Sequence, residues 1–185
     1  MPDPQRSSLD RFLRESRTIH DAWDTYSDEH TDLDGWPHDP HAYGLRAARR
    51  DRETADAFET VRDSAQHLLA AAEKQFASLP GRAVQHRWVW QLGTLRDALG
   101  QLDALHEQWL ATRDSLPADA KPGSEVFDDA LAEYHGEAWS YLDDWATHGH
   151  VIREIHTAAA QPGRSTSSPS PTAVAAPVRA TTVRR

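Results

Sequence analysis

The sequence predicts an all-α protein: an antiparallel, up-down four-helix bundle with one shorter N-terminal helix and three long helices, followed by a disordered C-terminal tail. The first observation is a heptad repeat that makes one face of a helix apolar for about ten turns. The second is that earlier segments repeat this pattern, and the third is that short turns containing Pro or Gly separate them, which makes neighbouring helices antiparallel. The positions of the heptad repeat are Phe127, Leu131, Tyr134, Ala138, Tyr141, Trp145, His148, Ile152, Ile155 and Ala159.

The first helix is expected from Leu9 to Glu29, with a serine near its start as the N-cap. The segment from His30 to Gly44 is predicted to be a loop, because Asp34-Gly35 and two prolines interrupt any helical pattern there. One face of this first helix is predicted to be buried, at Leu9, Phe12, Leu13, Ser16, Ile19, Trp23 and Tyr26.

The three long helices are expected from Leu45 to Leu79, from Arg82 to Leu116, and from Ser124 to Ala160. The second helix has a seam at Phe58, Val61, Ala65, Leu68, Ala72, Phe76 and Leu79. The third has a seam at Trp88, Leu92, Leu95, Leu99, Leu102, His106, Trp109, Arg113 and Leu116. We therefore expect one bundle domain over residues 1–160.

Residues 161–185 form a tail that is rich in Pro, Ser, Thr and Ala and has no aromatic residue, Leu or Ile. Such a segment buries too little apolar surface to offset its conformational entropy, so we predict that it is disordered. Its arginines Arg179, Arg184 and Arg185 are candidates for contact with a partner, either nucleic acid or an acidic protein surface. Three charges give only a weak and salt-sensitive attraction.

Charge and composition exclude several classes. The chain carries a net charge of −9, and its last 25 residues hold four arginines and no acid, so residues 1–160 carry −13. An acidic bundle is not expected to bind nucleic acid. No apolar run is long enough to span a membrane. The absence of cysteine excludes disulfides and thiolate chemistry and fits a reducing compartment, so we expect a cytoplasmic protein.

Eleven histidines are the first candidates for chemistry. Carboxylates lie three or four residues from them no more often than chance predicts, and no Glu-x-x-His motif occurs, so no metal or other cofactor is predicted. The helix register brings His106 opposite His135, and His67 together with Gly93 and His148. These histidines are either core residues satisfied by a neighbour or part of a polar ligand pocket between the second, third and fourth helices.

Two glycines inside the third helix, Gly93 and Gly100, each cost about 1 kcal/mol relative to Ala. We expect the large side chains opposite them, His148 and Tyr141, to fill the missing volume. The alternative is a ligand that approaches the backbone there.

Three tryptophans are candidates for partner binding. Trp90 and Trp139 lie off the main seams, so we expect one or both to be exposed on an apolar patch. Trp36 lies in a loop rich in Asp and His that fails the EF-hand pattern at both of its anchoring positions. This tryptophan either packs over the end of the bundle or contacts a partner.

The arginines from Arg46 to Arg52 form a last candidate, either as a patch for a phosphate or an acidic partner, or as a cluster neutralised by the acids beside it. No phosphate loop, dinucleotide fingerprint or nucleophile elbow occurs. The leading hypothesis is therefore a non-enzymatic interaction protein, such as an adaptor, a regulatory partner or an assembly component. The alternative is a ligand- or metal-binding bundle, including an enzyme. Heptad seams fit a homo-oligomer as well as a single-chain bundle.

Overall fold

The computed structural model of the protein describes residues 4–81 and 84–161, and these segments are helical without any extended strand. The all-α prediction is thus confirmed, whereas the predicted disorder of residues 162–185 falls on residues outside the described part of the chain. The helices are α1 (Pro4–His30), α2 (Pro40–Ser78), α3 (His86–Ser115), α4 (Glu125–His148) and α5 (His150–Ala159).

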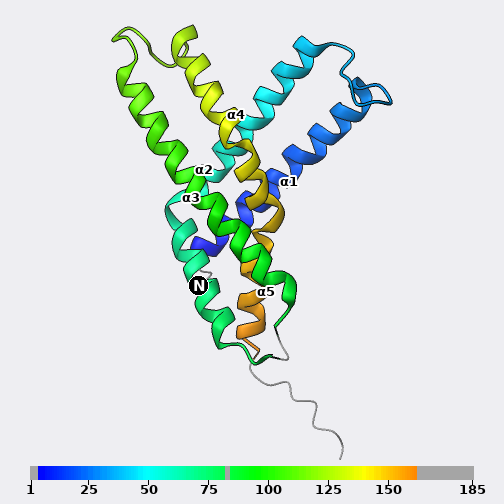
Figure 1. Ribbon diagram of the computed structural model, residues 1–185, viewed down its shortest axis with the longest axis vertical. Helices are drawn as coiled ribbons and strands as arrows, with labels where there is room; N and C mark the ends of the chain where they lie inside the picture. The colour runs from blue at the N-terminus through cyan, green and yellow to red at the C-terminus, as the bar shows by residue number, and fades with distance from the viewer. Residues whose placement is uncertain (1–3, 82–83, 162–185) are drawn as a thin grey trace, which may run out of the picture.

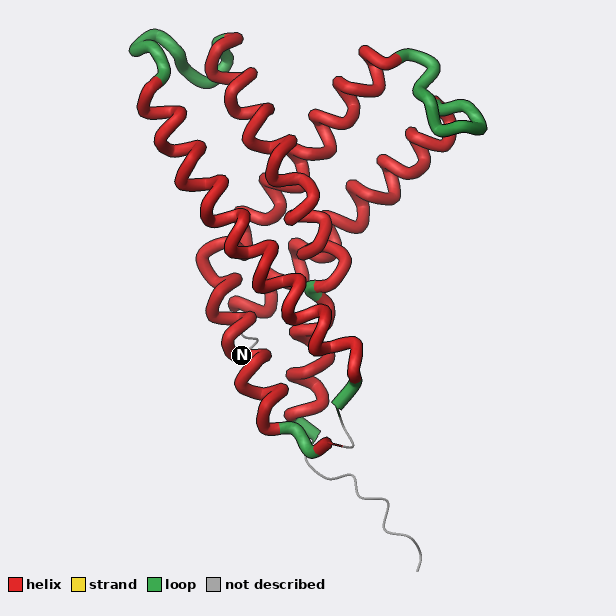
Figure 2. The backbone as a smooth tube through the Cα atoms, viewed as in Figure 1, coloured by secondary structure: helices red, strands yellow, loops and turns green. Residues whose placement is uncertain are grey.

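The helices form two antiparallel hairpins, α1–α2 and α3–α4, which pack against each other at one end of the molecule and diverge at the other (Figure 1). The tube in Figure 2 shows the same fork, with the α1–α2 loop at the end of one branch and the α3–α4 loop at the end of the other. We call residues 17–50 the α1–α2 arm, residues 103–134 the α3–α4 arm, and the remaining helical part the body. The predicted up-down order of the helices is present, with the two loops held apart.

All buried residues of the described chain lie in the body, and none lies in either arm. In the centre, the ring centroids of Trp145 and Phe58 are 5.5 Å apart, in edge-to-face geometry. The centroids of Phe58 and Phe12 are 5.3 Å apart, in the same geometry. The indole nitrogen of Trp145 donates a hydrogen bond to the carbonyl oxygen of Leu95, 3.2 Å away. Residues from four helices, α1 to α4, thus meet or bond within one core.

The predicted seams are confirmed, because each of their positions is buried or half-buried except Arg113, which is exposed. The register of the α3–α4 hairpin is confirmed too, since Trp109 stacks on Tyr134 and Trp145 reaches Leu95 as a turn near residue 120 requires. The pairing of the second and third helices differs from the prediction. α2 packs mainly against α1, α4 and α5, and only lightly against α3.

The start of α2 corrects the predicted loop from His30 to Gly44, because the helix already begins at Pro40. Asp39 is its N-cap, and its carboxylate accepts hydrogen bonds from the backbone N–H groups of His41 and Ala42, both at 3.0 Å. A proline in the first helical position gives up an N–H that has no partner in the helix anyway. Pro40 therefore starts the helix that it was expected to prevent.

Three further helix boundaries differ from the prediction. α1 begins at Pro4 instead of Leu9, and α3 begins at His86 instead of Arg82. The predicted fourth helix is interrupted at Gly149, which separates α4 from α5. A Cβ atom on Gly149 would lie 2.6 Å from the Trp145 carbonyl oxygen and 3.1 Å from Cδ2 of Leu13. A glycine at this position therefore allows α1 to pack closely against the α4–α5 junction.

The glycines inside α3 do not have the close neighbours that the sequence predicted. A Cβ atom on Gly93 or Gly100 would meet no atom within 4 Å, so His148 and Tyr141 do not fill those positions. His148 instead lies against Trp90, with ring centroids 4.7 Å apart. Both glycines therefore face open space instead of a large side chain.

Candidate interaction surface

The loop at the end of the α1–α2 arm has a defined conformation. Thr31 and Pro37 form an isolated antiparallel bridge, and the Asp32 N–H donates to the Trp36 carbonyl oxygen at 2.9 Å. One carboxylate oxygen of Asp32 accepts from the N–H groups of Asp34 and Trp36, at 3.0 and 2.8 Å. Gly35 has a positive φ, in the left-handed region that favours glycine. The loop is therefore held by its own backbone and one side chain.

This ordered loop holds two large apolar side chains in water. Leu33 is fully exposed, Trp36 is 72% exposed, and Leu45 near the start of α2 is 61% exposed. We call these three residues the tip surface. They are half of the six large apolar side chains that are exposed in the described part of the chain. Trp36 therefore does not pack over the end of the bundle, which leaves the partner alternative.

The segment that carries Leu33 and Trp36 is acidic. Residues 27–41 contain five carboxylates and three histidines, and no Lys or Arg. Asp32 and Asp39 bind backbone N–H groups of the loop and of α2. The other three carboxylates, on Asp28, Glu29 and Asp34, are exposed, and no ion pair joins them to a described residue. An apolar centre with a negative rim remains available to a partner.

Below the tip, the α1–α2 arm is held by half-buried aromatic residues. Tyr26 stacks on His30 with centroids 4.0 Å apart, and Trp23 meets Tyr43 at 4.9 Å. The Tyr43 hydroxyl forms a 2.8 Å hydrogen bond with the hydroxyl of Ser27. The contacts of Tyr43 join α2 to α1 where the arm has no core, whereas the stack of Tyr26 on His30 lies within α1.

At the fork, Arg50 of α2 lies between two tryptophans. Its guanidinium carbon is 3.6 Å from the ring centroid of Trp139 on α4 and 4.3 Å from that of Trp23 on α1. It also donates two hydrogen bonds to one oxygen of Asp51, at 2.6 and 2.8 Å. We call these four residues the Arg50 cluster. It is the point at which α1, α2 and α4 are joined by one cation.

Burial raises the pKa of the Asp51 carboxyl, and the hydrogen bonds and charge of Arg50 oppose that rise. Trp139, which was predicted as an exposed partner residue, is half-buried in this cluster. Nearby, Arg49 pairs with Glu53 at 2.6 Å, and Arg46 lies over the ring of Tyr26. The geometry favours a neutralised arginine cluster over a phosphate patch.

The α3–α4 arm is built around Tyr134. Trp109 stacks on the Tyr134 ring at 5.8 Å, and Phe127 meets Trp109 edge-on at 5.5 Å. The Tyr134 hydroxyl accepts a hydrogen bond from Arg62 of α2 at 3.2 Å, and burial raises its pKa. Among the described residues of this arm, Val126 is the only large apolar side chain that is exposed. Its aromatic side chains pack against each other and leave no counterpart of the tip surface.

His106 and His135 lie on either side of Tyr134, at the level that the register predicted. His106 Nδ1 is 3.4 Å from the Tyr134 hydroxyl, and the His135 ring is 5.5 Å from the Tyr134 ring. His135 is buried, and burial lowers its pKa, while the nearby charge of Asp56 acts in the opposite direction. Tyr134 is the neighbour of both imidazoles. This arrangement favours core histidines over a ligand pocket.

His67, Gly93 and His148 do not form a joint site. His67 is exposed, and no hydrogen bond, ion pair or ring contact joins it to Gly93 or His148 in the described structure. His148 is half-buried beside Trp90. Burial raises the pKa of the Asp144 carboxyl, and the electrostatic effect of His148 lowers it. The physical reason is the light contact between α2 and α3. Trp90 is 61% exposed next to the exposed Val89, so one of the two off-seam tryptophans is on the surface as predicted.

Chemistry that needs a metal has no support in the described residues, because no group of three or more His, Asp or Glu side chains is placed to hold an ion. None of the described helices is both long and apolar enough to cross a membrane. The candidate partner residues Arg179, Arg184 and Arg185 fall outside the described residues.

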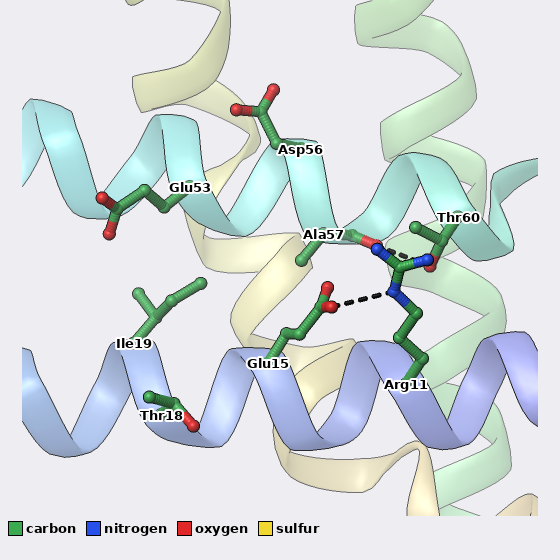
Figure 3. Close-up of a pocket in the computed structure, with 8 residues that line it drawn as sticks. All are labelled: Arg11, Glu15, Thr18, Ile19, Glu53, Asp56, Ala57 and Thr60. Atoms are coloured by element: carbon green, nitrogen blue, oxygen red, sulfur yellow. Dashed lines mark hydrogen bonds and ion pairs between the residues drawn. The ribbon is translucent and has the colours of Figure 1, made fainter.

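A groove of about 460 Å³ between α1 and α2 is one place to look for catalysis (Figure 3). Glu15 pairs with Arg11 at 2.8 Å, and Thr60 donates to the Ala57 carbonyl oxygen at 2.8 Å. Glu53 in the same groove pairs with Arg49. Each of these polar groups thus has a partner on its own helix, and the side chains do not converge on one point.

Sequence reasoning missed Leu33, Leu45 and the Arg50 cluster. Leu33 had a signal, since a leucine between two aspartates in a turn cannot belong to a helical seam. The sequence pointed to Arg50 and to Trp139 separately but not to their contact, because the cluster's members come from three helices whose crossing the sequence does not specify. In comparisons with known proteins, this chain matches no protein-family model, no curated protein and no solved structure.

Proposed function

We propose that this protein is a non-enzymatic interaction protein that binds a protein partner through the tip surface. The observation that carries the proposal is the ordered loop that holds Leu33 and Trp36 in water. The body then serves as the support that fixes the position of this arm.

The energetic argument starts from the two exposed side chains. Burying a side chain of this size is worth about 1.5–3 kcal/mol, which stays unused in the free protein. Because backbone hydrogen bonds already order the loop, a partner does not have to offset the loss of loop entropy. A preorganised tryptophan with a neighbouring leucine is the kind of anchor that dominates binding energy at protein interfaces.

The charges around the tip surface define the partner further. Three exposed carboxylates lie in the same loop or in the last turn of α1 just before it, on Asp28, Glu29 and Asp34. A partner of complementary chemistry has an apolar pocket rimmed by Lys or Arg side chains. Exposed charges of this kind mainly accelerate association, so we expect the association rate to fall as salt is added.

The test is site-specific photo-cross-linking followed by measurement of affinity. A photo-reactive amino acid is placed at position 38, an exposed position beside the tip surface that leaves Trp36 intact, and the cross-linked protein is identified in the protein's own host and purified. We expect Trp36→Ala to weaken its binding by about 30-fold or more, the effect of losing about 2 kcal/mol at an anchor. The matched control is Trp90→Ala, which removes another exposed tryptophan near the start of α3 and is expected to leave Kd unchanged.

Two outcomes contradict the proposal. One is an unchanged Kd for Trp36→Ala, which means that the tip surface does not bind. The other is an equal loss for Trp36→Ala and Trp90→Ala, which means that binding follows general surface apolarity.

A further inference from the structure

We infer that a cavity between α1, α4 and α5 binds a small anionic molecule that carries a phosphate group. The cavity has a volume of about 640 Å³ and lies where the α1–α2 arm joins the body, away from the tip surface. The polar side chains used in the argument are Arg14, Arg17 and His20 of α1, Thr147 of α4, and Arg153 of α5. This site is independent of the proposed function and lies elsewhere than the pocket predicted between the second, third and fourth helices.

The cavity is less acidic than the molecule as a whole. Residues 1–160 carry −13, because the chain is −9 and its last 25 residues add four positive charges. The cavity is nevertheless lined by three arginines and two histidines against two carboxylates, on Asp10 and Asp21. Counting the Asp143 carboxylate beside His20, three arginines face three carboxylates, so the site is far less negative than the rest of the molecule and repels an anion less.

Two of the arginines form no ion pair in the described structure, although Asp10 and Asp21 line the same cavity. Arg153 Nε lies 3.0 Å from Asp10 Oδ1, an ion pair without hydrogen-bond alignment. Arg14 and Arg17, in contrast, form no ion pair with any described residue. They lie three residues apart on α1, so their side chains start from neighbouring positions on one face of the helix. Two guanidinium groups are thus free to receive a ligand.

An imidazole lies at the edge of the same cavity. His20 Nε2 is buried and has no hydrogen-bond partner in the described structure. The ring is held by an edge-to-face contact with Trp139, with centroids 5.3 Å apart, and by Asp143, whose carboxylate oxygen is 3.6 Å from Nδ1. A buried polar atom without a partner is unfavourable unless a ligand or water satisfies it.

The donor set indicates phosphate. Guanidinium groups match phosphate oxygens with paired hydrogen bonds, and a phosphate dianion has enough acceptors for both Arg14 and Arg17. A single carboxylate would be satisfied by one guanidinium. Leu13 and Ala146 also line the cavity and offer an apolar wall to the organic part of the ligand.

The test is calorimetric titration of the full-length protein with inorganic pyrophosphate at low ionic strength, together with NMR of the histidine ring protons. We expect saturable binding with one site, and a shift of the His20 resonance on titration. The double variant Arg14→Ala/Arg17→Ala is expected to raise Kd at least tenfold. The matched control is Arg49→Ala/Arg113→Ala, which removes the same charge from exposed arginines elsewhere and is expected to change Kd less than threefold.

Circular dichroism first confirms that both double variants are folded; both remove exposed arginines, so neither is expected to disturb the core. The inference is wrong if no saturable binding occurs up to about 10 mM pyrophosphate, a concentration that already allows for very weak sites. It is also wrong if the control variant weakens binding as much as the double variant, because net charge alone then explains the affinity. A His20 resonance that stays fixed during saturation places the anion elsewhere and overturns the assignment as well.

Discussion

The body and the two arms are built from different interactions. In the body, aliphatic and aromatic side chains are removed from water completely, as for Phe12, Phe58 and Trp145. In the arms, aromatic rings and arginine side chains stack while remaining half exposed. The free energy of folding is therefore concentrated in the body, and the arms are segments of lower local stability. Residues on the arms can therefore serve binding without weakening the fold.

The two arms also differ from each other. The α3–α4 arm turns Trp109 and Phe127 toward Tyr134. The α1–α2 arm has a comparable stack around Tyr26, but it adds an ordered loop with Leu33 and Trp36 in solvent. The same helical hairpin is thus present twice, and only one copy carries an apolar end.

The sharpest way to break the distinction between body and arms is to truncate one tryptophan in each. Trp145→Ala is expected to lower the free energy of unfolding by about 3–5 kcal/mol, because it leaves a cavity in a fully buried site. Trp109→Ala in the α3–α4 arm is expected to lower it by at most ~2 kcal/mol, since that ring is only half-buried. Urea denaturation followed by circular dichroism gives both values. Equal losses would mean that the arms share in the core.

A second, smaller effect is expected where the arms join the body. Arg50→Ala is expected to lower the free energy of unfolding by about 2–3 kcal/mol, because it leaves the Asp51 carboxylate poorly solvated and uncovers two indole rings. Arg49→Ala, one residue away in an exposed pair with Glu53, is expected to lower it by ~0.5 kcal/mol or less.

The double variant Arg50→Ala/Asp51→Asn completes this experiment. It is expected to recover part of the loss, because the buried charge is then removed together with its partner. If its loss of stability equals the sum of the losses in Arg50→Ala and in Asp51→Asn, Arg50 acts through the tryptophans alone.

The smallest expected effect is a change with pH at the edge of the body. The pKa of His135 is lowered by burial below its ordinary value of 6.5, so the unfolded chain takes up this proton first. The contribution of neutral His135 to stability is present above about pH 6.5 and is lost as the pH falls through its folded pKa. His135→Gln is therefore expected to flatten the fall in stability below about pH 6.5, measured by urea denaturation at a series of pH values. A stability curve that falls as steeply below pH 6.5 in His135→Gln as in the unmodified protein would contradict the assignment.

Most of the fold was predictable because its signals are local. A heptad seam depends only on residues within one helix, and the short turn before α4 fixes how Trp145 meets Leu95. The contact of α2 with α4 and α5 was not predictable, because crossing geometry depends on how side chains of three helices interlock. The grouping of His67 with His148 failed for that reason.

The candidate surface was predictable in part. The sequence named Trp36 and the alternative of a partner contact, because an indole in a loop of Asp and His has no seam to join. It did not identify Leu33 or Leu45, since the exposure of a single leucine depends on where a loop points. Trp139 was expected among the exposed candidates, but the cation of Arg50 covers one of its faces.

The position of Arg50 has a mechanical consequence. Ten residues separate it from Pro40, so α2 extends about 15 Å beyond the fork before the loop begins. A rotation of about ten degrees at this level carries the start of the loop through roughly 3 Å, because a helix is stiff over this length. Small rearrangements of the two tryptophans around the Arg50 guanidinium thus produce larger changes in the distance between the ends of the two arms. The contacts at the fork therefore set the span that the molecule offers to a partner.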